Sequence, residues 1–398
     1  MTPDAFRKAA PLIVLAAVLP LGMVPANRGA TAFLCAAAAL AWFAAGAPAR
    51  GMAADILRTL REDRLAQAAA ALAGFALVSI AWSHDRLGGL RQFGEMLLPL
   101  AAFLILARAL PRPLPRWAAP LLAVSLILAA LVIIADLKYG LPLRRWLNLR
   151  DNSFVHNRPA VLLALTLFPL AALMQARGAR FWLLPVSAAV TAAALASESG
   201  AALTALAAGS MAMLFGLALP RLAHKLGLAA LAAAFALAPF AGPVLARIAP
   251  ERFLEATASM SSAARIKIWQ AYSGAVQSKP LAGSGFGSSV TLNAAPLNHG
   301  LPPDLGVLLG TGHPHNMVLQ VWVELGLSGA LAATLLTLAL FRRHVRPGHP
   351  EFAWRLGFAA AVATVAFVSH GAWQGWFWSI VAAGAVWFGA AEASRRAA

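Results

Sequence analysis

The stretch Trp117-Ala-Ala-Pro-Leu-Leu-Ala-Val-Ser-Leu-Ile-Leu-Ala-Ala-Leu-Val-Ile-Ile-Ala-Asp-Leu137 is apolar almost throughout and decides the fold class. About 20 consecutive apolar residues suffice for a helix to cross a bilayer. Counting this stretch, apolar runs lie at 9–26, 29–47, 66–83, 92–109, 117–137, 159–175, 181–197, 200–219, 226–247, 316–341, 354–371 and 373–391. Alanine, glycine and serine within them allow close helix contacts in lipid. The sequence therefore predicts an all-α polytopic membrane protein, with about 12 transmembrane helices in a single bundle over residues 1–398.

Composition agrees with this class. Of the 398 residues, 60% are hydrophobic and 12% are charged, whereas soluble proteins are about half apolar and a quarter charged. No large soluble catalytic domain is expected. Cys35 is the only cysteine, which excludes an intrachain disulfide and a thiolate metal cluster. Arg7 and Lys8 before the first run resemble a signal peptide, but we expect an uncleaved helix because similar runs recur along the chain.

The excess of basic residues predicts the topology. Lys and Arg number 32 against 15 Asp and Glu, a formal charge of +17. In a soluble protein this would indicate nucleic acid, but cytoplasmic loops of membrane proteins collect Lys and Arg. Basic residues on the side of both termini are Arg50, Arg58, Arg61, Arg64, Arg108, Arg112, Arg116, Arg177, Arg180, Arg221, Lys225, Arg342, Arg343 and Arg346. That side is predicted to be the cytoplasm, and no nucleic-acid partner is expected.

Two basic segments fall on the other side. The linker 138–158 and the long segment 248–315 keep several Lys and Arg against the topology rule. An anionic substrate on the outer face is the simplest reason, and the alternative is that long loops translocate regardless of charge. On the inner side, residues 48–65 read as an amphipathic helix lying among the lipid headgroups.

The stretch Gly312-His-Pro-His-Asn-Met-Val-Leu-Gln-Val-Trp-Val-Glu-Leu-Gly-Leu-Ser-Gly329 carries the most chemical information. Asn316, Gln320 and Glu324 are spaced by four, so they share one face of a helix and point into the bundle. Such a polar stripe is costly in a membrane unless it lines a wet cavity. His315 at the lip of that cavity is a candidate general base. The alternative is that His315 caps the helix or bonds a loop carbonyl.

Two weaker motifs occur nearby. His313 and His315 could hold zinc together with His299 and Asp304, although the sequence offers no fixed geometry for such a site. Lys279-Pro-Leu-Ala-Gly-Ser-Gly-Phe-Gly287 lacks the Lys-Ser/Thr ending of a P-loop, so we interpret it as a tight turn at the membrane surface.

Upstream, residues 262–276 read as a helix with Arg265 and Trp269 on one face and Lys267 on another. A guanidinium can bind a diphosphate through two parallel hydrogen bonds and stays charged when partly buried. Arg265 is therefore a candidate diphosphate ligand. The alternative is a solvated loop arginine.

These elements together resemble a known family. They are Arg265 with Trp269, Pro280-Leu-Ala-Gly-Ser-Gly-Phe-Gly287, His315-Asn316, Gln320, Glu324-Leu-Gly-Leu and Gly329. The segment from Arg265 to Leu336 resembles the signature region of the bacterial O-antigen ligase and O-antigen polymerase family, membrane glycosyltransferases of the GT-C class. The span count, the long loop between the ninth and tenth helices and the chain length also fit.

The resemblance implies transfer of a glycan from an undecaprenyl diphosphate carrier to an acceptor hydroxyl at the periplasmic face of the inner membrane, without nucleotide sugar, metal or other cofactor. His315 matches the family's essential histidine and Arg265 its loop arginine. Val155-His-Asn-Arg-Pro-Ala160 resembles the polar start of the family's sixth helix, so Arg158 becomes a second diphosphate candidate. Around the catalytic pair His315 and Arg265, we expect substrate contacts from Arg158, Arg150, Lys267, Trp269, His313, Asn316, Gln320 and Glu324.

One departure from the family pattern is Ser197-Glu-Ser-Gly200, where many members have a Ser-Arg-Gly-like element. Arg158 or Arg150 could replace the missing arginine, and the role of Glu198 stays open. Within the family we favour a ligase that transfers the glycan to lipid A-core over a polymerase that uses the same site. A lipid-linked glycan flippase or transporter is the rival from another class, but it would place charged residues at the membrane midplane.

Overall fold

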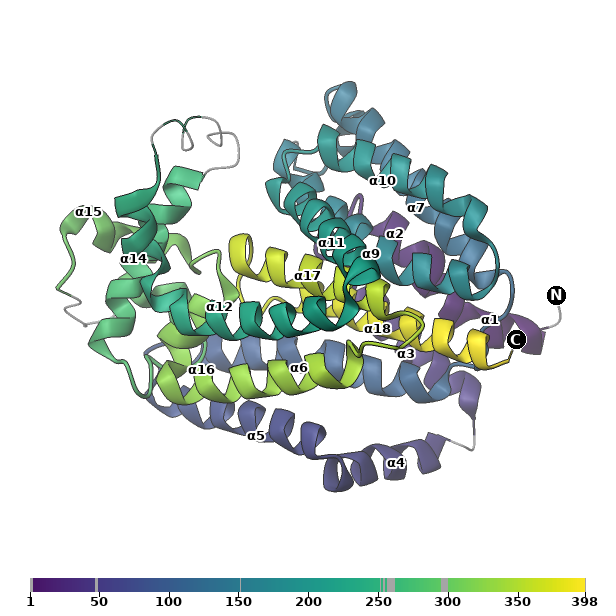
Figure 1. Ribbon diagram of the computed structural model, residues 1–398, viewed down its shortest axis with the longest axis horizontal. Helices are drawn as coiled ribbons and strands as arrows, with labels where there is room; N and C mark the ends of the chain where they lie inside the picture. The colour runs from purple at the N-terminus through teal and green to yellow at the C-terminus, as the bar shows by residue number, and fades with distance from the viewer. Residues whose placement is uncertain are drawn as a thin grey trace.

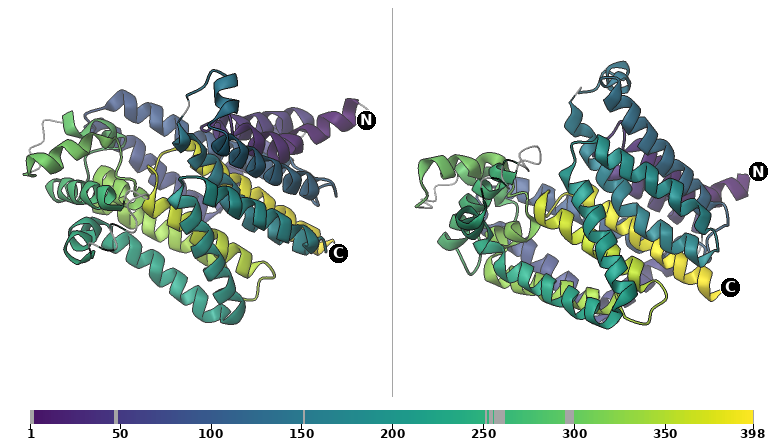
Figure 2. Two further views of the ribbon diagram at one scale, coloured as in Figure 1. Left: turned by 90° about the horizontal axis from the view of Figure 1, so that it is seen from above. Right: turned by 45° about the horizontal axis from the view of Figure 1, so that its top comes forward.

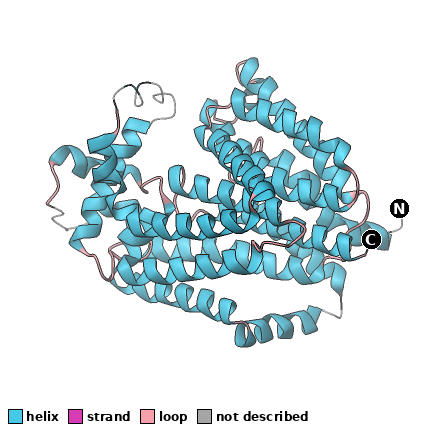
Figure 3. Ribbon diagram, viewed as in Figure 1, coloured by secondary structure: helices cyan, strands magenta, loops and turns pink. Residues whose placement is uncertain are grey.

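The computed structural model describes residues 3–46, 49–150, 152–250, 252, 255, 262–294 and 300–397 (Figure 1). Every regular element in these residues is helical, and Figure 3 shows helices joined by loops. The N-terminal half contains α1 (Pro3–Ile13), η1 (Val14–Val18), α2 (Leu19–Gly22), α3 (Ala30–Ala45), α4 (Ala49–Glu62), α5 (Arg64–Ser79), η2 (Ile80–Trp82), α6 (Arg86–Ala109), α7 (Ala118–Lys138), α8 (Pro142–Trp146), η3 (Ser153–His156), α9 (Asn157–Ala176), η4 (Arg180–Trp182) and α10 (Leu183–Ala196). The C-terminal half contains α11 (Gly200–Ala218), α12 (Pro220–Ile248), α14 (Ser262–Ser278), η6 (Ser288–Ala294), α15 (Pro303–Gly306), η7 (Val307–Thr311), α16 (Met317–His344), α17 (Phe352–Val368) and α18 (Gly375–Arg396).

The apolar runs of the sequence become helices. Among the described residues, 9 helical segments are long and apolar enough to cross a membrane, and shorter apolar helices occupy Ala30–Ala45, Arg180–Ala196 and Phe352–Val368. Each of the twelve predicted runs coincides with one of these segments. The chain is thus a polytopic, all-helical membrane protein. The shorter helices fall below the usual spanning length of about 20 residues, so the predicted twelve crossings remain a prediction.

The bundle packs through small residues around α9, which is buried along almost its whole length. At the crossing of α11 and α17, a Cβ added to Gly209 would lie 2.8 Å from the Gly357 carbonyl oxygen. Only two glycines let these backbones approach so closely. The predicted tight packing of one bundle is therefore present at this crossing.

Local capping explains where several helices begin. Asp63 Oδ1 accepts the Leu65 amide at 2.8 Å and separates α4 from α5, and Asp85 Oδ1 accepts the Gly88 amide at 2.9 Å at the start of α6. Side chains of this kind satisfy the otherwise unpaired first N–H groups of a helix. Helix α4 confirms a helix within the predicted segment 48–65, whose place among headgroups stays a prediction.

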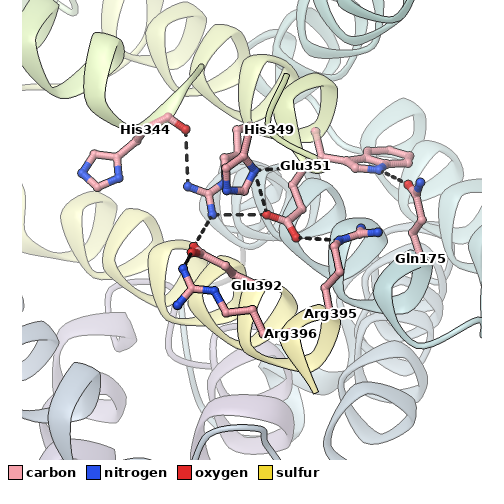
Figure 4. A network of polar contacts seen from close by, with 9 residues as sticks. Gln175, His344, His349, Glu351, Glu392, Arg395 and Arg396 are labelled. Carbon is pink, nitrogen blue, oxygen red and sulfur yellow. Dashed lines mark hydrogen bonds and ion pairs between the residues drawn. The ribbon is translucent and has the colours of Figure 1, made fainter. Parts of the chain in front are cut away.

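The end of the molecule that holds both termini carries a polar network (Figure 4). Glu351, just before α17, is fully buried, and its carboxylate accepts from Arg355 and Arg395, each at 3.3 Å. Arg355 also contacts Glu392 of α18 at 3.1 Å. Ion pairs of this kind hold the loop between α16 and α17 against the end of α18.

The opposite end is formed by the segment between α12 and α16, and Figures 1 and 2 show α14 and α15 there, away from the termini. Here α16 is broken at Gly326, which has φ +63°. The glycine-rich turn completes the backbone at the break: Ser284 and Gly285 donate to the Val323 and Glu324 carbonyls, both at 2.8 Å. Gly283 has φ +67°, and a Cβ there would lie 2.4 Å from the Glu324 carbonyl oxygen. The glycine cluster therefore forms a turn, as predicted. The hydrogen bonds of Ser284 and Gly285 attach this turn to α16.

Candidate functional site

Four segments meet near the start of α16. They are the start of α9, helix α14, the link from η7 into α16, and the loop 369–374 between α17 and α18. Trp269 Nε1 of α14 donates to the Pro314 carbonyl at 2.9 Å, and His315 Nδ1 lies 2.7 Å from the Ser369 carbonyl oxygen. The Arg158 guanidinium of α9 lies 5.4 Å from the ring centroid of Trp376, at the start of α18. The site is thus built by residues far apart in the sequence.

His315 is held in an unusual backbone conformation. Its φ of +53° is left-handed, a region that costs free energy for a non-glycine residue and that is concentrated at functional sites. A carbonyl oxygen only accepts hydrogen bonds, so the contact with Ser369 requires the proton of neutral His315 on Nδ1. Its Nε2 is then a lone-pair acceptor. The alternative that His315 bonds a loop carbonyl is therefore also correct. That bond uses Nδ1 and leaves the role of Nε2 unaffected.

The surroundings keep His315 uncharged at neutral pH. Burial lowers the pKa of His315 below its ordinary value, and the nearby charge of Arg265 lowers it further, while the Ser369 carbonyl acts in the opposite direction. A neutral imidazole that carries its proton on Nδ1 can accept another at Nε2. The helix itself is capped by Asn316, whose Oδ1 accepts the Leu319 amide at 3.0 Å.

His313 plays a different part. Its Nδ1 accepts the backbone N–H of His315 at 3.2 Å, and the two ring centroids are 4.3 Å apart. Its Nε2 lies 3.3 Å from Gln374 Nε2. Burial, followed by the neighbouring His315 and Arg158, lowers the pKa of His313 to about 3. His313 is therefore neutral at pH 7 and supports the backbone at His315.

Cations surround the two histidines. Arg265 lies close enough to His315 to influence it electrostatically, and Arg158 does the same for His313. Arg28, in the link between α2 and α3, is the charged neighbour of Arg158. Within the described parts of the chain, Arg158 forms no ion pair with a carboxylate. Such a concentration of positive charge suits an anion.

Two predicted ligands lie elsewhere. Arg150 and Lys267 are exposed, and among the described residues no hydrogen bond or ion pair joins either side chain to His313 or His315. Arg144 is the buried arginine of the linker 138–158; its Nε donates to the Arg150 carbonyl at 2.6 Å. Lys267 lies on the other face of α14 from Arg265, as the spacing predicts.

The polar stripe points into the bundle, as predicted, with Gln320 and Glu324 on α16 and Asn316 as the residue that caps its start. Asn316, Gln320 and Glu324 are all buried. However, N–H groups from residues 287–289 and from the loop 369–374 bond to the oxygens of Gln320 and Glu324, so protein donors stand where the sequence predicts a wet cavity. Gln320 Oε1 accepts the Ala372 amide at 2.8 Å, and Glu324 Oε2 accepts Trp373 Nε1 at 2.6 Å.

The loop 369–374 carries none of the motifs that predict the site. Beyond the Ser369 carbonyl and Gln374, it brings His370, whose ring packs edge-on against Trp376 at 4.7 Å. His370 Nε2 is buried without a partner among the described residues, and burial with the nearby cations lowers its pKa well below the usual value. The signal was His370-Gly-Ala-Trp-Gln-Gly-Trp-Phe-Trp378, where His, Gln and three Trp stand at the junction of two apolar runs.

The zinc alternative has no support in the described residues, where no group of three or more His, Cys, Asp or Glu is placed to hold a metal. His299 lies outside the residues that the structure describes, and Asp304 is in the first turn of α15.

Fold and site together define a multi-pass membrane protein with a neutral histidine among arginines at one end of its bundle. Residues 184–334 match the family model described as O-antigen ligase, which confirms the family resemblance. This domain is shared by O-antigen ligases and polymerases, enzymes that process lipid-linked glycans. No curated protein matches the chain. The matched segment includes Arg265 and His315 but neither Arg158 nor the loop 369–374.

Proposed function

We propose that this protein is a metal-independent, inverting glycosyltransferase of the O-antigen ligase type. It would move a glycan from an undecaprenyl diphosphate carrier to lipid A-core at the periplasmic face of the inner membrane. The observation that carries this proposal is the 2.7 Å contact between His315 Nδ1 and the Ser369 carbonyl oxygen, which leaves Nε2 as a proton acceptor among arginines.

In the proposed reaction, His315 Nε2 takes the proton of the acceptor hydroxyl while its oxygen attacks the anomeric carbon. The bond from that carbon to the diphosphate oxygen breaks, and the electron pair leaves with the diphosphate. Arg265 and Arg158 stabilise this charge, so no metal is required. A single displacement inverts the configuration at the anomeric carbon. Trp269, His313 and Asn316 shape the site, and Arg150 and Lys267 remain candidates for contacts with the glycan or with lipid headgroups.

The orientation follows from the positive-inside rule. Both termini and the network around Glu351 would face the cytoplasm, and the segments 138–158 and 248–315 would face the periplasm. The site then opens where the carrier presents its diphosphate.

Reconstitution in liposomes with purified carrier-linked glycan and two alternative acceptors tests the proposal. Consumption of lipid A-core with release of undecaprenyl diphosphate supports the ligase. Extension of the carrier-linked glycan instead assigns the same site to a polymerase, and movement of the donor between leaflets without a new glycosidic bond identifies a flippase.

A further inference from the structure

The carboxylate of Glu324 connects three separate parts of the site. It is 0% exposed and accepts four N–H groups. Oε1 accepts from Gln320 Nε2 at 2.8 Å and from the Ser289 amide at 3.4 Å. Oε2 accepts from the Gly287 amide and from Trp373 Nε1, both at 2.6 Å. An ionised carboxylate is an acceptor with about four lone-pair sites, so this environment occupies both oxygens and leaves none for substrate.

The contacts continue from Glu324 to the histidines. Gln320, oriented by Glu324, accepts the Ala372 amide at 2.8 Å, and Trp373 is bound by Glu324 directly. The loop 369–374 is therefore held at two adjacent residues. The same loop supplies the Ser369 carbonyl to His315 Nδ1, and it places Gln374 Nε2 3.3 Å from His313 Nε2. A shift of this loop would move the group that selects the tautomer of His315.

The break in α16 fixes the other side of the carboxylate. The helical backbone of α16 is interrupted at Gly326, so the carbonyls of Val323 and Glu324 lack their usual partners within the helix. The turn that precedes Gly287 donates to both of these carbonyls. The Gly287 amide is thus set by the same helix that carries Glu324. This arrangement makes the carboxylate a rigid reference point for the loop.

We propose that Glu324 is a positioning residue, which sets the tautomer and orientation of His315 through the loop 369–374 and does not touch the substrate. The inference rests on the proposed function for its kinetic consequences. It replaces the sequence expectation that Glu324 contacts the substrate.

The main test is Glu324→Gln. An amide has one acceptor oxygen, and its NH₂ would face two N–H donors whichever way it is turned, so one side of the network is lost. Trp373→Phe is the milder variant, because it removes a single donor and keeps an aromatic ring. The matched control is Glu62→Gln, the same chemical change at an exposed position of α4.

A displaced base should reduce kcat on the order of 10²-fold, as expected for a misplacement of about 1 Å. KM for the carrier-linked donor should change less than about twofold, because the arginines are untouched. The acid limb of the pH–rate profile should also move to lower pH. The Ser369 carbonyl favours protonated His315, and its loss lowers that pKa. The other titratable or charged groups near His315, namely His313, His370 and Arg265, are unchanged in the variants, as is Arg158 near His313.

A second readout needs no glycan transfer. Diethylpyrocarbonate modifies neutral imidazole, so mass spectrometry of the His315 peptide as a function of pH gives the midpoint of its titration. We expect a lower midpoint in Glu324→Gln, a smaller shift in Trp373→Phe, and no shift in Glu62→Gln. The proposal is overturned if folded Glu324→Gln shows less modification of His315 but the same pH midpoint as the wild type. If Glu324→Gln does not fold, an unchanged midpoint in Trp373→Phe overturns it. If the wild type transfers no glycan while the midpoints shift as expected, the proposed function fails and the positioning role stands.

Discussion

The loss of the His315 imidazole gives the sharpest test of the mechanism. His315→Asn is the preferred variant because Asn tolerates left-handed backbone better than most residues, whereas Ala at φ +53° adds strain to the chemical loss. Removing a general base costs on the order of 10² to 10⁴ in rate. Binding of the carrier diphosphate should be largely retained, because Arg265 and Arg158, which we propose as its ligands, are unchanged.

His313→Ala is the matched comparison. It deletes the acceptor of the His315 amide, a hydrogen bond of 3.2 Å. Such a bond contributes about 0.5–1.5 kcal/mol, so we expect a loss of roughly tenfold at most. Release of carrier diphosphate from purified donor measures turnover, and retention of labelled carrier measures binding. If His313→Ala abolishes turnover while folded His315→Asn retains it, the base is His313 and the reasoning is refuted.

The wild-type pH profile follows from the same geometry. In the proposed mechanism the active form of His315 is neutral, and its pKa lies below its ordinary value of about 6.5 because of burial and Arg265. Activity should therefore be on its plateau at pH 7 and fall only as the pH drops through the lowered pKa. A limb centred above pH 7 would identify a different group as the base.

Three further predictions concern the charge, the metal and the orientation. Arg265→Lys should lower kcat/KM roughly 10- to 100-fold, because an ammonium replaces two parallel charge-assisted hydrogen bonds by one, and wild-type turnover of the folded variant would reject Arg265 as a diphosphate ligand. Activity should survive exhaustive EDTA treatment; loss on chelation with recovery on added zinc would restore the histidine-metal hypothesis. In a Cys35→Ala background, Asn293→Cys should react with an impermeant thiol reagent applied from the periplasmic side, and labelling only after the inner membrane is breached would reverse the orientation.

The helices were predictable because hydrophobicity over about 20 residues is a strong local signal. The glycine turn and the inward face of Asn316, Gln320 and Glu324 were also predictable from local sequence. Glycine favours the positive φ of a tight turn, and residues spaced by four share one face of a helix. The partners of these residues were not. Nothing near Glu324 in the sequence indicates Trp373. Where the sequence predicts a wet cavity, Glu324 instead accepts the Gly287 amide and the Trp373 indole N–H, which come from 37 and 49 residues away.

The proposed site extends beyond the matched domain into the loop 369–374. Residues 184–334 carry the proposed base and one of the two proposed diphosphate ligands, but the atom that sets the tautomer of His315 is the Ser369 carbonyl oxygen. A backbone carbonyl leaves no residue-type signature, so no motif could have identified it. Arg158 likewise reaches the site from α9, outside the matched segment, where Trp376 of α18 packs against it. The chemistry that we propose therefore depends on how the first six predicted spans and the last two dock onto the domain between them, and substitutions at those contacts should act on His315 without touching it.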